Sequence, residues 1–150
     1  TFFVCGKNCQ KYPSVLRQIL NEGHSLGHHS FSHSLKFFFN FKKEIEKTNE
    51  IFKEIVGKET KLFRPPWGFL FLPLKNYLLK NGYRIVLWDI DLLDWCWWRP
   101  INSFERLDKR IKRLNKDDIT ILLHERLKTV LNLEKLLTNL KKGNFEFAKW

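Results

Sequence analysis

Short apolar segments alternate with longer amphipathic ones along this chain of 150 residues, and that alternation constrains its fold more than any other feature. The apolar segments predict buried strands, and the segments with helical spacing of apolar residues predict helices. Strict alternation is typical of a parallel sheet or barrel with helices outside it. We expect a single domain over residues 1–150. Strands are predicted at residues 1–4, 25–28, 61–63, 83–88, 119–123 and 145–148, and helices at 13–23, 40–56, 73–80, 104–114 and 129–142.

Four of the five histidines lie between Gly23 and His33. His29 and His33 are four residues apart, so a single helical turn would bring their imidazoles to one point. Neutral imidazole is a good ligand for a zinc-like divalent cation, but a catalytic site needs a third protein ligand and an open position for water. The alternative is an exposed helical turn whose histidines only titrate near neutrality.

Three further polar residues follow predicted strands, on the face where barrels carry their sites. His124 could act as a general acid whose pKa is set by a carboxylate neighbour, for which we choose Asp94. Arg64 is fixed between a strand and a rigid Pro-Pro turn, which suits a guanidinium held against a carboxylate. The alternatives are a buried histidine that closes a strand end and an ordinary salt bridge of the arginine.

Two roles are possible for the aromatic residues near these positions, and two for the acidic residues. The tryptophans could form flat apolar walls on which sugar rings sit, or they could pack in the core. Asp89 and Asp91 could form an acidic pair, or they could belong to a solvated loop. The four tryptophans concerned are Trp67, Trp95, Trp97 and Trp98.

Composition excludes some classes of protein. A hydrophobic content of 43% excludes a disordered chain. No apolar run approaches the roughly 20 residues of a membrane-spanning helix, so no transmembrane segment is expected. The net charge of +11 would suit an acidic partner, but much of it lies on the solvated face of the predicted helix 104–114, and we expect no nucleic-acid partner. The three cysteines are expected to be structural.

Five motifs occur in the order that is typical of one family. The sequence resembles the polysaccharide deacetylases of the NodB homology type, which are metal-dependent carbohydrate esterases. The resemblance covers essentially the whole chain. The motifs are Thr1 to Gly6, Gly23 to His33, Arg64 to Gly68, Asp91 to Trp95 and Leu122 to His124.

The resemblance implies a distorted (β/α) barrel and removal of N-acetyl groups from an N-acetylhexosamine polysaccharide or oligosaccharide, chitin-like or peptidoglycan. It also implies a divalent metal, with zinc expected and cobalt, nickel or manganese as alternatives. By the same likeness each candidate residue has a role. His29 and His33 would bind the metal, His124 would be the general acid tuned by Asp94, Arg64 would orient the base, and Trp95, Trp67, Leu122 and Pro66 would contact the substrate.

One departure from the family pattern concerns its first motif, Thr-Phe-Asp-Asp-Gly, which supplies the catalytic base and a third metal ligand. This chain opens at the strand that should follow that motif. We therefore expect an N-terminally incomplete barrel that lacks the first strand, as a fragment or as a degenerate homologue. Asp89 or Asp91 could replace the missing pair. The alternative functions are a non-catalytic carbohydrate-binding homologue and, less favoured, a basic nucleic-acid-binding domain.

Overall fold

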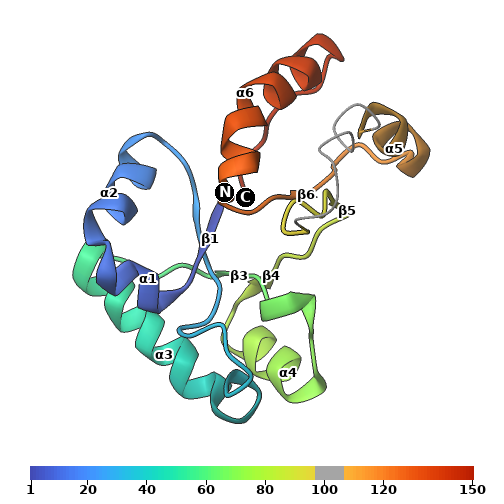
Figure 1. Cartoon of the computed structure of the whole chain (residues 1–150). Helices are drawn as coiled ribbons and strands as arrows, with labels where there is room; N and C mark the ends of the chain where they lie inside the picture. Colours follow the sequence, from blue (N-terminus) through green and yellow to red (C-terminus); the bar gives the residue numbers. More distant parts are fainter. Residues whose placement is uncertain (97–106) are drawn as a thin grey trace. The chain divides into compact units, whose positions relative to one another are not determined.

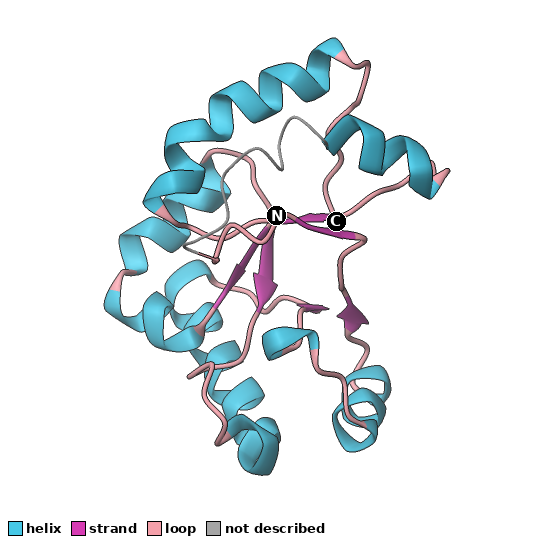
Figure 2. Cartoon of the chain, turned by 45° about the vertical axis from the view of Figure 1, so that its right-hand side comes forward, coloured by secondary structure: helices cyan, strands magenta, loops and turns pink. Residues whose placement is uncertain are grey.

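The computed structural model describes residues 1–96 and 107–150, which form two compact units. The first unit comprises Thr1–Leu87 with Lys149–Trp150, and the second comprises Trp88–Ala148. Short strands and much longer helices make up both units, as Figure 2 shows by colour. Within the described ranges, no helix combines the length and the apolar character of a membrane span.

The first unit is built on a four-stranded parallel sheet with the strand order β1-β2-β3-β4. Helices α1, α2 and α3 pack against one another beside this sheet, and α4 packs near β4 (Figure 1). A short 3-10 turn, η1, separates β3 from α4. The bounds are β1 Phe2–Val4, α1 Gly6–Lys11, α2 Pro13–Asn21, β2 Leu26–His28, α3 Phe37–Val56, β3 Leu62–Phe63, η1 Pro66–Gly68, α4 Leu72–Lys80 and β4 Arg84–Ile85.

Two apolar clusters form the core of the first unit, and both rest on α3. One joins Leu16, Leu26 and Phe52, and the other joins Phe37, Ile45, Phe63, Leu74 and Leu78. Parallel strands covered in this way are apolar without alternation, as the sequence of β1 predicts. The carboxyl ends of β1, β2 and β3 therefore lie along one edge of the sheet, where His29 and Arg64 follow their strands.

The second unit contains a two-stranded parallel sheet and two helices around a third apolar cluster. Ile90 of β5 pairs with Ile121 of β6, and Asp91 pairs with Leu122. The helices contribute Leu107, Leu136 and Leu140 to the cluster. The bounds are β5 Ile90–Asp91, α5 Leu107–Leu114, β6 Ile121–Leu122 and α6 Leu127–Lys142.

Most predicted elements are present, with four differences. Residues 145–148 do not form a strand, so that prediction is wrong. Helix α1 was not predicted. Helix α3 begins at Phe37 rather than at the predicted residue 40, and Asn40 is a non-helical residue inside it with φ −124° and ψ 21°. Asp91 belongs to strand β5, whereas the sequence placed it in a loop.

Some predictions fall on residues outside the described part of the chain: Trp97, Trp98, and the start of the helix predicted at residues 104–114. The cysteines that the structure describes agree with structural roles. Cys9 is buried in the first unit, where burial raises the pKa of its thiol to about 12. Cys96 is a buried free thiol of the second unit.

Candidate functional site

His29 and His33 lie in the loop that follows β2, and their rings are close together. The ring centroids are 4.8 Å apart. The loop is not helical, so the predicted helical turn is wrong. Ser30 and His33 instead adopt left-handed backbone angles, with φ 62° and φ 50°, and these two reversals fold the loop back on itself. A tight loop thus brings together the two imidazoles that the spacing singled out.

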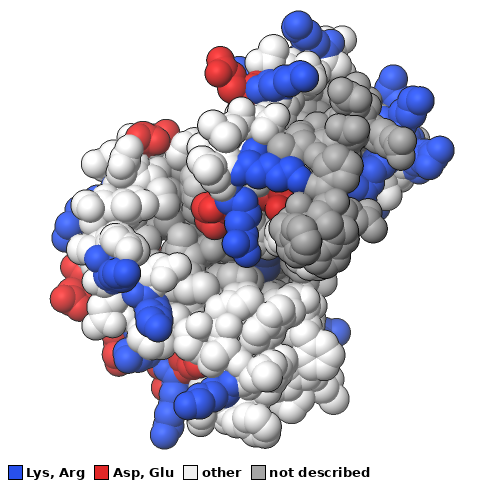
Figure 3. Space-filling model, viewed as in Figure 1, with Lys and Arg blue, Asp and Glu red and all other residues white. Residues whose placement is uncertain are grey.

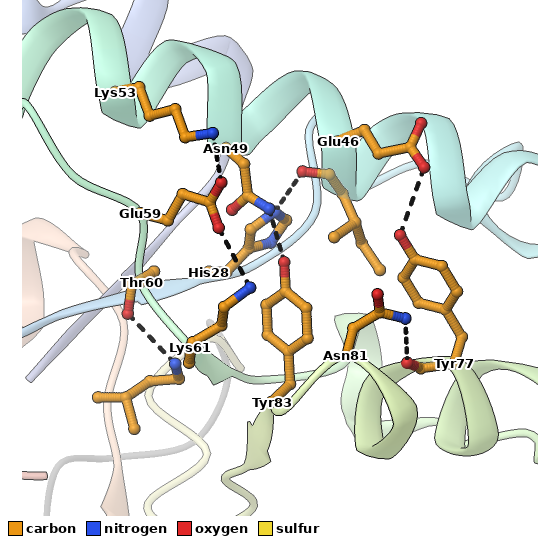
Figure 4. Close-up of polar contacts among 12 residues, drawn as sticks. His28, Glu46, Asn49, Lys53, Glu59, Thr60, Lys61, Tyr77, Asn81 and Tyr83 are labelled. Carbon is orange, nitrogen blue, oxygen red and sulfur yellow. Dashed lines mark hydrogen bonds and ion pairs between the residues drawn. The ribbon is translucent and has the colours of Figure 1, made fainter.

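His28, the residue before this pair, holds the loop in place from inside the core. Its ring is fully buried, and burial lowers its pKa to about 4, so the ring is neutral at neutral pH. Nε2–H donates to the Ile45 carbonyl at 3.1 Å (Figure 4), and Nδ1 accepts from the Ser30 amide at 3.0 Å. The Ser30 hydroxyl oxygen in turn accepts from the His33 amide at 3.1 Å. A chain of hydrogen bonds therefore connects α3 to His33, one of the two candidate ligands.

The ring of His29 is oriented by the backbone of the next strand. Its Nδ1 lies 2.7 Å from the Arg64 carbonyl oxygen. Because a carbonyl oxygen only accepts, Nδ1 carries the proton, and the lone pair of the neutral ring is on Nε2. This is the arrangement in which a second hydrogen bond fixes the tautomer of a metal-binding histidine.

Arg64 is buried beside this pair, with 8% of its surface exposed. Its guanidinium donates through Nε to Val86 O at 3.2 Å and lies 4.0 Å from the centre of the Phe3 ring. Burial lowers its pKa to about 10, so it stays charged at neutral pH. The Phe3 ring crosses over Gly27, where any side chain would overlap it. The role of Arg64 in orienting a base stays a prediction.

Pro66 and Trp67 form the turn that follows Arg64. Pro66 is buried, whereas Trp67 is 48% exposed and its ring centroid lies 4.6 Å from that of His33. Trp67 has φ 54°, a conformation that is rare for a bulky residue. His29, His33, Arg64, Pro66 and Trp67 are thus neighbours within the first unit, at the carboxyl edge of its sheet.

The second unit carries the other candidate residues around Asp94. The two oxygens of this buried carboxylate take part in three hydrogen bonds. His124 Nδ1 lies 2.8 Å from Oδ1, and Oδ2 accepts from the His124 amide at 2.7 Å and from the Thr129 hydroxyl at 2.6 Å. Burial alone would raise the pKa of Asp94, but the hydrogen bonds from Thr129 and His124 outweigh it and lower that pKa below its usual range. Asp94 is therefore ionised at neutral pH.

Leu122 and Trp95 lie in the same unit as Asp94 and His124. Leu122 is buried in β6, two residues before His124. Trp95 is 47% exposed, and its Nε1–H donates to Asp91 Oδ2 at 3.3 Å. Contact of these residues with a substrate stays a prediction. The candidate residues are therefore divided between two units, His29, His33, Arg64, Pro66 and Trp67 in the first and Asp94, Trp95, Leu122 and His124 in the second.

A complete metal site is not present among the described residues. Within residues 1–96 and 107–150, no three His, Cys, Asp or Glu side chains are grouped so that they could hold a metal ion. His29 and His33 fit two positions of a zinc-like centre, which needs at least three. The described residues therefore fit the expected metal only in part.

Two residues that support the candidate site are not indicated by the sequence. For His28, only its place inside an apolar strand could have indicated a buried, hydrogen-bonded ring. Thr129 is the first residue of the predicted helix 129–142, and its hydroxyl donates a hydrogen bond to the Asp94 carboxylate. A threonine five residues after a histidine has no signal of its own, because the contact depends on how α6 turns back to the strand.

Comparison with known proteins identifies the family. The polysaccharide deacetylase family model matches residues 1–86. This chain belongs to the polysaccharide deacetylase family. A peptidoglycan-N-acetylglucosamine deacetylase of Bacillus cereus is 35% identical over 98 residues, which are 63% of this chain and 36% of that protein. A second one from the same species is 29% identical over 160 residues, which cover 100% of this chain and 59% of that protein.

The solved structures agree with this assignment. The crystal structure of a polysaccharide deacetylase from Bacillus cereus matches with a TM-score of 0.85 at 26% identity, over 99% of this chain and 77% of that one. The predicted α/β fold of the polysaccharide deacetylase type is thereby confirmed. The chain spans between about one third and three fifths of the two curated relatives described above.

Proposed function

We propose that this protein hydrolyses the N-acetyl amide of an N-acetylhexosamine polysaccharide, either peptidoglycan or a chitin-like chain. The observation that carries the proposal is the hydrogen-bonded pair of Asp94 and His124. A histidine oriented by a buried carboxylate is the usual arrangement of a general acid or base. Membership of the polysaccharide deacetylase family, with relatives named for N-acetylglucosamine in peptidoglycan, supports the substrate class.

His124 donates the proton in this proposal. Its Nδ1–H is directed at Asp94, so Nε2 is the atom that gives a proton to the departing amine. The His124 side chain is 39% exposed, whereas that of Asp94 is 4% exposed. A substrate can therefore reach His124, while the Asp94 carboxylate is shielded from solvent. The ionised Asp94 stabilises the imidazolium form of His124.

The proposed cofactor is a divalent cation, zinc or otherwise cobalt, nickel or manganese, bound by His29 and His33. A third ligand is needed in addition to the described residues. When bound, such a cation would supply Lewis-acid polarisation of the carbonyl of the scissile amide. The chain itself contributes the neutral His29 ring, whose Nδ1–H is fixed by the Arg64 carbonyl.

The remaining candidates bind or orient in this proposal. Trp67 and Trp95 are exposed enough to offer ring surface to a sugar, and the buried Leu122 contacts the acetyl methyl group. Pro66 fixes the turn that presents Trp67. Arg64 would orient the base, which in the family pattern comes from the first motif.

The test combines two measurements on the purified chain, metal content and acetate release from N-acetylglucosamine oligomers. We expect His124→Ala to lower turnover at least about 100-fold while metal content persists. His29→Ala and His33→Ala should lower metal content. His24→Ala is the matched control, because His24 is a half-exposed histidine of the same segment and none of the proposed roles uses it.

Three results would contradict this proposal or redirect it. If His124→Ala retained turnover, His124 would not be the general acid. If metal content were unchanged in His29→Ala and His33→Ala, these two histidines would not be the metal ligands. Glycan binding without acetate release, unaffected by a chelator, would instead favour a non-catalytic carbohydrate-binding protein, an alternative that the incomplete metal site among the described residues keeps open.

A further inference from the structure

A continuous row of aromatic rings leads from His33 across the surface of the first unit. We call it the ring row, and it consists of His33, Trp67, Phe38 and Phe69. The ring centroids of His33 and Trp67 are 4.6 Å apart, those of Trp67 and Phe38 are 5.6 Å apart, and those of Phe38 and Phe69 are 5.5 Å apart. These separations are typical of aromatic pairs in direct contact. The row therefore runs from His33, a candidate metal ligand, to the exposed ring of Phe69 on the surface of the first unit.

The outer end of the ring row is supported from the core but open to solvent. Phe71 stacks behind Phe69 with an interplanar angle of 23°, and Phe41 meets Phe71 edge-on at 5.4 Å. Phe41 belongs to the second core cluster of the first unit. Phe69 nevertheless keeps 57% of its surface exposed. A ring that is held on one side and exposed on the other offers a rigid apolar face.

The backbone at Trp67 is strained in a way that presents this row. Its φ of 54° is unfavourable for a non-glycine residue, and such strained backbone clusters at binding and catalytic sites. A core position would repay the strain by burial, but this side chain is half exposed. The strained turn therefore favours a function for the exposed rings.

We propose that Phe38 and Phe69 extend the site into a platform for further sugar residues of the glycan chain, beyond the residue that lies at His33. The apolar C–H face of a hexosamine ring packs on the electron-rich face of an aromatic ring. The surface over α4 and the segment before it carries few charged side chains, which suits a neutral glycan (Figure 3). This inference rests on the proposed function and adds which side chains would contact the sugars beyond the one at His33.

Continuity with His33 favours a glycan over a lipid surface. A patch that enters a membrane would rely on its most protruding apolar side chains. In this region those are Phe39, 87% exposed, and Leu35, 71% exposed, and both lie outside the ring row. The row consists instead of rings that lean on one another and begin at the histidine pair.

The test compares binding of an N-acetylglucosamine hexamer and dimer to the intact chain by calorimetry. We expect Phe69→Ala to raise the Kd for the hexamer about threefold to tenfold. The Kd for the dimer should stay unchanged, because a dimer occupies only the part of the site near His33. Phe69→Trp should retain hexamer affinity. Phe39→Ala is the matched control, because it removes a more exposed phenylalanine of the same surface.

The outcomes separate the inference from the proposed function. Hexamer binding that Phe69→Ala and Phe39→Ala change equally, or not at all, would overturn the platform while the proposed function stands. Weaker dimer binding in Phe69→Ala would also overturn it. Binding of neither oligomer by the unsubstituted chain would overturn both. Binding to phosphatidylglycerol vesicles that is lost in Phe39→Ala and in Phe69→Ala, without an effect on glycan, would assign the surface to lipid.

Discussion

The buried ring of His28 should make the first unit sensitive to acid, and His28→Asn should remove that sensitivity. Burial lowers the pKa of His28 from 6.5 to about 4. The difference corresponds to about 3 kcal/mol of preference for the neutral ring in the folded state. Asn is a suitable replacement because its side-chain oxygen can take the place of Nδ1 as acceptor for the Ser30 amide.

The direction of the effect follows from the order of the two pKa values. Since the folded value lies below the unfolded one, the unfolded chain takes up a proton first as the pH falls. The contribution of His28 to the free energy of unfolding is therefore complete above about pH 6.5 and is lost between about pH 6.5 and pH 4. His28→Asn has no such group, so its free energy of unfolding should fall less over this interval, by about 3 kcal/mol.

The assay is urea unfolding at several pH values, followed through NMR signals of amides in β2 and α3 so that it reports on the first unit alone. A chelator is present throughout, so that loss of metal from His29 and His33 does not contribute. His24→Asn is the control, because it replaces a half-exposed histidine of the same segment by the same residue type. Parallel pH profiles of the unsubstituted chain and His28→Asn would refute the neutral, buried ring.

Two further predictions concern packing and charge. Asp94→Asn should lower the free energy of unfolding of the second unit by about 1.5–3 kcal/mol at neutral pH. Since the folded pKa of Asp94 is lowered, this difference should shrink as the pH falls through that pKa, and a constant difference in urea unfolding would contradict the ionised carboxylate. Gly27→Ala should cost about 1–3 kcal/mol because its new methyl group overlaps the Phe3 ring. Adding Phe3→Leu should recover part of this loss in a thermal unfolding measurement, and no recovery would place the strain elsewhere.

The order of strands and helices could be predicted because apolar periodicity directly reports which residues face a core. Helix α1 lacks such a stripe. Its first residue, Gly6, instead lies so close to Thr48 and Phe31 that a side chain there would collide with them, so the helix depends on tertiary contact with α3. The strand predicted at residues 145–148 failed for the opposite reason, because the apolar pattern is present but the strand is not. Alternating Phe145 and Phe147 fit a strand, but a strand also needs a partner, which a single sequence does not identify.

The candidate site was predictable in its members but not in its geometry. Spacing alone singled out His29 and His33, yet two left-handed residues rather than a helical turn bring them together. Nothing in the sequence indicates that Ser30 adopts φ 62°, because its amide donates to the ring of His28, and that ring is held in turn by the Ile45 carbonyl of α3. Such supporting contacts join segments that are distant in the sequence.

Asp89 and Asp91 are the two candidates for a carboxylate ligand of the metal, and their contacts argue against that role. Asp89 is paired with Lys116 and accepts from the Thr120 amide at 3.0 Å. Asp91 accepts from the Leu93 amide at 2.7 Å and from Trp95 Nε1. Recruiting either side chain to a metal would break contacts that hold β5 to its surroundings, at about 1–3 kcal/mol for each lost hydrogen bond to a charged group.

We therefore expect Asp89→Asn and Asp91→Asn to leave zinc affinity unchanged, while His29→Ala and His33→Ala lower it at least about tenfold, as is typical when a supporting or direct ligand is removed. Calorimetric titration with zinc measures all four variants. Unfolding of the second unit serves as the internal control, because Asp89→Asn should weaken it through the lost contacts with Lys116 and Thr120. A fall in zinc affinity in either aspartate variant, without loss of folded protein, would show that these carboxylates do reach the metal.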